Sequence, residues 1–191
     1  MGVITQTAVA GIGHNGGPEM TGLSWRTHCW RAARARLVPT LPLEVVRLRV
    51  RRAAELGLEY KTYAGIRAST GHDLVAFLFS SNALRILRAG QALPSDRAVK
   101  LAAVSSAGLI GLALPPLQAA ALAQAAPVLS QSHSAPHHLA SFAEARHRLR
   151  EVLGKTPPDT VLLIGDHGLE AEWCAAGRLA GYLPAERYFA P

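Results

Sequence analysis

Apolar residues recur at intervals of three and four along much of this chain, which is the spacing of amphipathic helices. The pattern predicts successive helices over Ser24–Val38, Pro42–Leu56, Tyr60–Ser69, 72–89, from Asp96 onward, Leu139–Leu153 and Glu170–Ala180. One short apolar run, TVLLI at 160–164, is bounded by Gly165 and predicts a strand. Helices therefore dominate the expected structure.

These elements predict a mainly α fold, a helical bundle with a helix-turn-helix-like pair and a small C-terminal α/β element. Hydrophobic residues make up 49% of the 191-residue chain and charged residues 17%, which is enough apolar material for a folded core. We expect four regions: a flexible tail at 1–22, a basic helical domain at 23–100, an Ala-rich apolar helical segment at 101–130, and a linker helix with the α/β element at 131–191.

Positive charge is concentrated in the first half of the chain. Residues 1–100 hold 14 Lys and Arg against 6 Asp and Glu, whereas residues 101–191 hold 6 against 7. The predicted helix over Pro42–Leu56 places Arg47, Arg51 and Arg52 largely off its apolar stripe. A dense cationic region favours a polyanion as partner, although an arginine-rich solvated surface explains the same pattern.

Residues 60–78, YKTYAGIRASTGHDLVAFL, combine two expected helices with a Gly-containing turn. Thr70 and Asp73 have the spacing of a capping box that would begin the second helix. The stretch is similar to the helix-turn-helix pattern at four positions: Ile66, Gly71, Leu74 and Phe77. It departs from that pattern at Arg67, where the motif has a small residue. The resemblance implies a second helix that enters the major groove.

A helix-turn-helix would place polar side chains from its second helix against bases and basic side chains against phosphates. Ser80, Ser81 and Asn82 are further candidates, but they span most of a helical turn and do not share one face. The predicted nucleic-acid-binding residues are Arg47, Arg51, Arg52, Lys61, Arg67, His72, Asp73 and Arg85.

The N-terminal segment GIGHNGGP, at 11–18, resembles a short segment near the N-termini of small alphaproteobacterial and phage-derived proteins, several of which bind DNA. The resemblance implies nothing about the fold. The stretch 101–129 lacks Asp, Glu, Lys and Arg and is long enough to span a bilayer, but Pro115-Pro116 interrupts it. We expect a buried helical hairpin there, with a membrane segment as the alternative.

Other candidate sites are weaker. His133, His137 and His138 cluster around Pro136 without a nearby carboxylate or thiol to complete a metal shell. Asp166 and His167, with the acids of 170–172, follow the predicted strand, but adjacent residues on an extended chain point in opposite directions. No nucleophile motif accompanies them, so we expect no enzymatic activity, metal or organic cofactor.

These observations favour a bacterial nucleic-acid-binding regulator, with DNA or another polyanion as its partner. The alternative is a membrane-associated or protein-interaction factor that uses 101–129. A homodimer is compatible with either interpretation. Cys29 and Cys174 match no metal or redox spacing, and the N-terminus lacks a signal-peptide pattern, so we expect free thiols and a cytoplasmic location.

Overall fold

The computed structural model describes residue 29 and residues 41–190. The chain divides into two units, 1–42 and 43–191, and every element below belongs to the second unit. The predicted tail at 1–22 and, apart from Cys29, the helix predicted over Ser24–Val38 lie outside the described residues.

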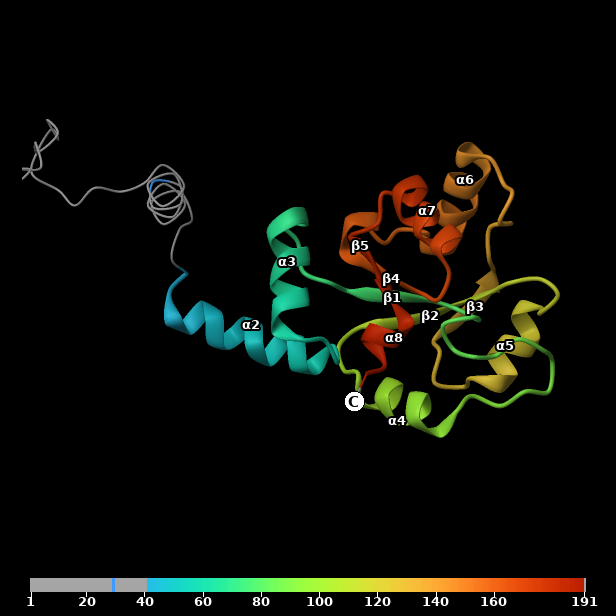
Figure 1. Cartoon of the computed structure of the whole chain (residues 1–191), viewed down its shortest axis with the longest axis horizontal. Helices are drawn as coiled ribbons and strands as arrows, with labels where there is room; N and C mark the ends of the chain where they lie inside the picture. Colours follow the sequence, from blue (N-terminus) through green and yellow to red (C-terminus); the bar gives the residue numbers. More distant parts are fainter. Residues whose placement is uncertain (1–28, 30–40, 191) are drawn as a thin grey trace, which may run out of the picture. The chain divides into compact units, whose positions relative to one another are not determined.

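The second unit is built around a five-stranded sheet in which all neighbouring strands are parallel (Figure 1). Its order is β3-β2-β1-β4-β5, so the first strand lies at the centre and the chain moves outward in both directions. The strands are β1 (Ala76–Ser80), β2 (Gly108–Ala113), β3 (Gln131–Ser134), β4 (Val161–Gly165) and β5 (Gly181–Pro184). This is the strand order of a doubly wound α/β sheet.

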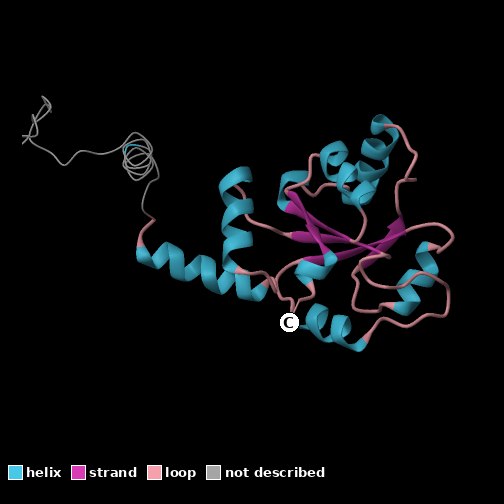
Figure 2. Cartoon of the chain, viewed as in Figure 1, coloured by secondary structure: helices cyan, strands magenta, loops and turns pink. Residues whose placement is uncertain are grey.

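Helices cover both faces of the sheet (Figure 2). The helices are α2 (Leu43–Glu55), α3 (Tyr60–Thr70), α4 (Ser95–Ala103), α5 (Ala119–Ala125), α6 (Phe142–Leu153), α7 (Gly168–Gly177) and α8 (Ala185–Tyr188), with a 3-10 turn at Pro158–Thr160. Helices α6 and α7 pack on one face, whereas α3, α4, α5 and α8 contribute to the core on the other. The helix after each strand therefore returns the chain to the next parallel strand.

Two apolar clusters, one on each face, hold the sheet between the helices. Side chains alternate along β1, so Phe77 and Phe79 enter the cluster with α3, α4, α5 and α8, while Ala76 and Leu78 enter the cluster with α6 and α7. Every residue of β1 is buried. The sequence of a strand that is covered on both faces is a continuous apolar run, without alternating polar residues.

The prediction of a mainly α-helical bundle is wrong, because the sheet organises the fold. The helices predicted over Pro42–Leu56 and Tyr60–Ser69 are confirmed as α2 and α3, and the strand over TVLLI is confirmed as β4. The helix predicted over 72–89 does not form, because its apolar residues belong to the buried strand β1 and the turns that follow it. A short apolar run is compatible with either a buried strand or a buried helix, and the periodicity favoured the wrong one.

The expected helical hairpin at 101–129 is also absent. Residues 101–103 end α4, residues 108–113 form β2, which pairs with β1 and β3, and residues 119–125 form α5. None of the helices among the described residues is both long and apolar enough to cross a bilayer.

Candidate functional site

The clearest concave surface with concentrated charge lies between α2 and α3. We call it the arginine groove: a space of about 350 Å³ lined by Val45, Leu48, Arg49, Arg51, Arg52, Glu55, Tyr63, Arg67 and Asp73. Four guanidinium groups face two carboxylates there, so the lining carries excess positive charge. Because α2 supplies most of these residues, its sequence determines most of the chemistry of the groove.

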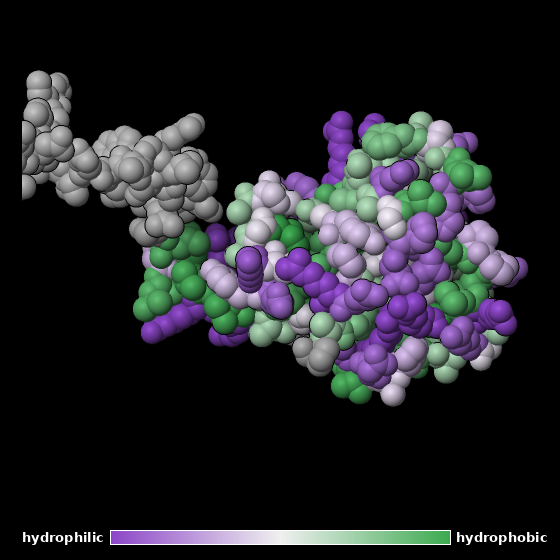
Figure 3. Space-filling view, viewed as in Figure 1, coloured by the Kyte–Doolittle hydropathy of each residue, from purple (hydrophilic) through white to green (hydrophobic). Residues whose placement is uncertain are grey.

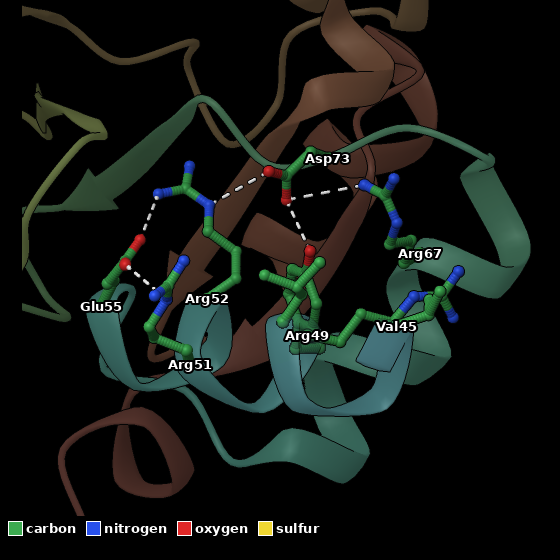
Figure 4. Close-up of a pocket in the computed structure, with 9 residues that line it drawn as sticks. Val45, Arg49, Arg51, Arg52, Glu55, Arg67 and Asp73 are labelled. Carbon is green, nitrogen blue, oxygen red and sulfur yellow. Dashed lines mark hydrogen bonds and ion pairs between the residues drawn. The ribbon is translucent and has the colours of Figure 1, made fainter. Parts of the chain in front are cut away.

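Asp73 organises the charged side chains of the groove (Figure 4). Its Oδ2 accepts a hydrogen bond from Arg52 Nε at 3.0 Å, and its Oδ1 accepts one from the Tyr63 hydroxyl at 2.8 Å. Arg67 approaches Oδ1 from the other side, at 3.7 Å. One carboxylate thus pairs with an arginine from each of two helices, Arg52 of α2 and Arg67 of α3.

Arg52 is further fixed by bonds that leave it little freedom. Its Nη2 donates to the carbonyl oxygens of Leu74, at 2.9 Å, and Ser106, at 3.2 Å, and its Nη1 donates to Glu55 at 3.2 Å. The Arg52 side chain is only 18% exposed. A planar guanidinium can meet several acceptors in fixed directions, whereas a lysine ammonium would not reproduce this set.

The protonation states of Asp73 and Tyr63 follow from these contacts. Burial alone would raise the pKa of Asp73, but the hydrogen bond from Tyr63 and the charge of Arg52 together lower it below its ordinary value. Burial and the Asp73 carboxylate raise the pKa of the Tyr63 hydroxyl. Asp73 is therefore ionised and Tyr63 is neutral at physiological pH.

Two arginines of α2 are largely open to solvent, and one of them, Arg51, also lines the groove. The side chains of Arg47 and Arg51 are 66% and 74% exposed, and their carboxylate partners are the exposed Glu44 and, at 3.9 Å, Glu55. Exposed ion pairs of this kind contribute little to stability. Apolar side chains also reach the surface of this unit, and green atoms lie among purple ones around α2 in Figure 3. On α2 these are Leu43, Leu48 and Val50.

The structure removes the helix-turn-helix on which the DNA-binding regulator was predicted. Gly71 ends α3 in the left-handed conformation, with φ 76°, and an extended segment leads into β1. Thr70 and Asp73 form no capping box: the Thr70 hydroxyl accepts from the His72 amide at 3.2 Å, and the backbone amide that donates to the Asp73 carboxylate is that of Leu74. Among the described residues, α3 is not directly followed by a second helix that could enter the major groove of DNA.

The predicted binding residues consequently fall on different surfaces. Arg51, Arg52, Arg67 and Asp73 line the arginine groove, and Arg47 lies on the exposed side of α2. Lys61 is exposed on α3, and His72 lies 3.4 Å from Asp159. Arg85 lies beyond β1, 3.2 Å from Asp166. Arg49, which also lines the groove, was not among the predicted residues although it is on the same basic helix.

Polar residues meet at the carboxyl ends of β1 and β4, around Glu170. This carboxylate is 0% exposed and accepts three hydrogen bonds of 2.8 Å, from the Ser80 hydroxyl, the Asn82 amide and the backbone N–H of Asp166. Ser80 and Asn82 lie some 90 positions away in sequence, so only the parallel pairing of β1 with β4 brings them together. Ser80 thus ends β1, and Ser81 and Asn82 lie in the turn that follows it, so none of the three belongs to a helix that could contact DNA bases.

The remaining candidate residues are not gathered into one site. Asp166 pairs with Arg85, while His167 Nδ1 accepts from the Leu169 amide at the start of α7, so the two do not form an acid-base pair. His133 lies in β3, and His138 stacks on Trp173. Among residues 29 and 41–190, no three His, Cys, Asp or Glu side chains are arranged to hold a metal ion.

Comparisons with protein-family models, with curated proteins and with solved structures give no match for this chain.

Proposed function

We propose that this protein binds the phosphate backbone of nucleic acids through the arginine groove and the exposed arginines of α2. The observation that carries the proposal is the groove itself, in which four arginines face two carboxylates. Both carboxylates are already engaged by Arg52, so the positive charge of Arg49 and Arg51 remains available to a ligand. The proposed contacts are to phosphates and carry no base specificity.

The geometry of the groove supports a backbone ligand. Arg52 and Arg67 are held in place by Asp73 before any ligand arrives, which reduces the conformational entropy lost on binding. Arg47 is exposed and lies about one helical turn before Arg51 of the groove, so it extends the cationic surface of α2 beyond the groove. Guanidinium groups bind phosphate oxygens in a bidentate manner, which favours a phosphodiester over a diffuse anionic surface.

The test is a binding titration of a fluorescent random-sequence oligonucleotide, single-stranded or duplex, at two or more salt concentrations. We expect the substitution of Arg47, Arg49 and Arg51 by Ala to weaken binding to all sequences alike. For duplex it should also reduce the slope of log K against log salt by up to about 3, since each phosphate contact contributes about 0.9.

A matched control removes the same charge elsewhere. Arg88, Arg150 and Lys155 are exposed and lie outside the groove. The triple variant of these residues to Ala should bind with the affinity and salt slope of the parent chain. Equal losses in the two triple variants would mean that net charge, and not the groove, causes the binding. Undiminished binding in the α2 variant would contradict the proposal outright.

A further inference from the structure

A second pair of arginines lies at the carboxyl edge of the sheet, away from the arginine groove. The chain leaves β1 toward the face with α4 and α5, and leaves β4 toward the face with α6 and α7. Because β1 and β4 are neighbours, this edge is the topological switch point of the sheet. Doubly wound sheets bind ligands outside the carboxyl ends of their strands at such a point. The segments that follow β1 and β4 are therefore placed to bind a ligand.

Arg97 is a buried cation that lacks a compensating partner. It belongs to the first turn of α4 and is 8% exposed, and its Nη1 is buried without a hydrogen-bond partner among the described residues. Within residues 41–190 it forms no ion pair with a carboxylate. Its guanidinium lies against the Phe189 ring, 4.5 Å from the ring centroid, and this contact fixes its position. A buried charge without a counter-ion is costly.

The surroundings make the positive charge of Arg97 less favourable still. Burial lowers the pKa of Arg97 most, the charge of Arg85 lowers it further, and Asp96 and Asp166 offset these effects only in part. The first turn of a helix also carries a partial positive charge from the unpaired amides, which disfavours a cation there. An anion beside Arg97 would compensate for its burial, for the charge of Arg85 and for the partial positive charge of the helix end.

Arg85 is the solvent-exposed arginine of this pair. Its side chain is 49% exposed, and its Nη1 makes one contact with Asp166 Oδ2 at 3.2 Å. Its backbone has a φ of 57°, a left-handed conformation that is uncommon for arginine. Hydrogen bonds from Arg85 N to Asn82 O and from Ile86 N to Ser81 O hold the turn in this shape, each at 2.9 Å. Unusual backbone conformations of this kind cluster at ligand-binding sites.

We propose that Arg85 and Arg97 bind the phosphate group of a small ligand at the switch point. A phosphate supplies an acceptor for the unpaired Nη1 of Arg97 and a negative charge between two guanidinium groups that otherwise repel each other. Its several oxygens can accept hydrogen bonds from both arginines at once. This site does not depend on the function proposed for the arginine groove, because the two share no residue.

The experiment measures thermal unfolding of the full chain with inorganic phosphate, adenosine monophosphate or adenosine, with chloride added to hold the ionic strength constant. We expect the melting temperature to rise with the logarithm of phosphate concentration, as it does when a ligand binds only the folded state. Arg97→Met keeps an apolar stem against Phe189 and removes the charge. It should weaken phosphate binding about tenfold or more, which corresponds to one lost charged hydrogen bond.

Two further variants keep the test decisive. Arg85→Asn should weaken phosphate binding as well, and asparagine tolerates the left-handed backbone at this position. Arg49→Ala should leave the phosphate response intact, since Arg49 lies in the arginine groove. A response lost in Arg49→Ala and retained in Arg97→Met and Arg85→Asn would place the phosphate in the groove and overturn the proposal.

The three ligands separate the sources of the phosphate group. A response to inorganic phosphate alone identifies the free ion as ligand, and a stronger response to adenosine monophosphate identifies a phosphate monoester; either result supports the site. A response to adenosine equal to that of adenosine monophosphate, or no response to any phosphate, contradicts it.

Discussion

Removal of the Glu170 side chain should destabilise the fold, because its carboxylate joins α7 to the carboxyl ends of β1 and β4. Its carboxylate accepts from Ser80, Asn82 and the Asp166 amide, and it is completely buried. Glu170→Ala leaves the Ser80 hydroxyl and the Asp166 amide without an acceptor. Each such loss costs about 1–3 kcal/mol. Removal of a desolvated charge offsets part of this cost, so we expect a net loss of about 2–5 kcal/mol.

Glu170→Gln should cost less, about 1 kcal/mol, because it keeps one oxygen for the Ser80 hydroxyl and the Asp166 amide. Its new amide group then faces Asn82, whose side-chain amide can turn to present its own oxygen. The order of stability should therefore be parent, Glu170→Gln, Glu170→Ala. Urea unfolding followed by circular dichroism measures this order as shifts in the transition midpoint at constant slope.

Glu172→Ala is the matched control, since Glu172 is exposed two residues further along α7. A surface substitution away from specific contacts should change stability by no more than about 0.5 kcal/mol. If Glu170→Ala unfolded at the same urea concentration as Glu172→Ala, the hydrogen bonds of Glu170 would not stabilise the switch point, and the reasoning would be refuted.

Three further substitutions test the close contacts around the two carboxylates. Gly165→Ala would place a Cβ 2.5 Å from Glu170 Oε2 and 2.6 Å from the Tyr182 ring, so it should destabilise the fold by about 1–3 kcal/mol in the same urea assay. Tyr63→Phe removes the hydroxyl that donates to Asp73 and should lower stability by about 1 kcal/mol. Asp73→Asn should destabilise at neutral pH, and this deficit should shrink as the pH falls below about 4. The lowered pKa of Asp73 stabilises the fold above the unfolded-state value and is lost as the carboxylate becomes protonated. A pH-independent deficit for Asp73→Asn would contradict this assignment.

The elements predicted correctly from the sequence are those whose apolar spacing and end residues are both clear within the element and its neighbours. Helix α2 has a clear apolar stripe beside charged positions, and Gly57 follows its end. Strand β4 is a short apolar run between a proline-containing break and Gly165, too short for a typical helix. In both cases local spacing and local end signals agree with the final structure.

Strands β1 and β2 were missed for one physical reason. Both are buried on the two faces of the sheet, so their apolar residues do not alternate with polar ones. Thr70 and Asp73 happen to have the spacing of a helix N-terminus. In the structure Asp73 instead accepts hydrogen bonds from Arg52 and Tyr63. The acidic side chain of a capping box can equally form a long-range ion pair, as Asp73 does with Arg52, and spacing alone does not distinguish the two roles.

The candidate sites were predictable only in part. The density of arginine on α2 identified the basic surface, because those residues are neighbours in sequence. The pairing of Arg52 with Asp73 and of Glu170 with Ser80 depends on contacts across 21 and 90 residues. The buried state of Arg97 depends likewise on α4 packing near Phe189. Only the folded chain shows which charged side chains are already neutralised.

That distinction changes how the net charge of the protein should be interpreted. Arg52 and Arg67 count as positive charges in the sequence, but within the fold Arg52 is paired with Asp73 and Glu55, and Arg67 lies 3.7 Å from Asp73. These two guanidinium groups would present positive charge to a ligand in fixed positions. Arg49 and Arg51 stand on the same helix without so close a partner, so they are the residues that gain most when an anion enters the groove. The function proposed for α2 thus depends on how closely each of its arginines is paired with a carboxylate after folding, and a count of arginines does not determine it.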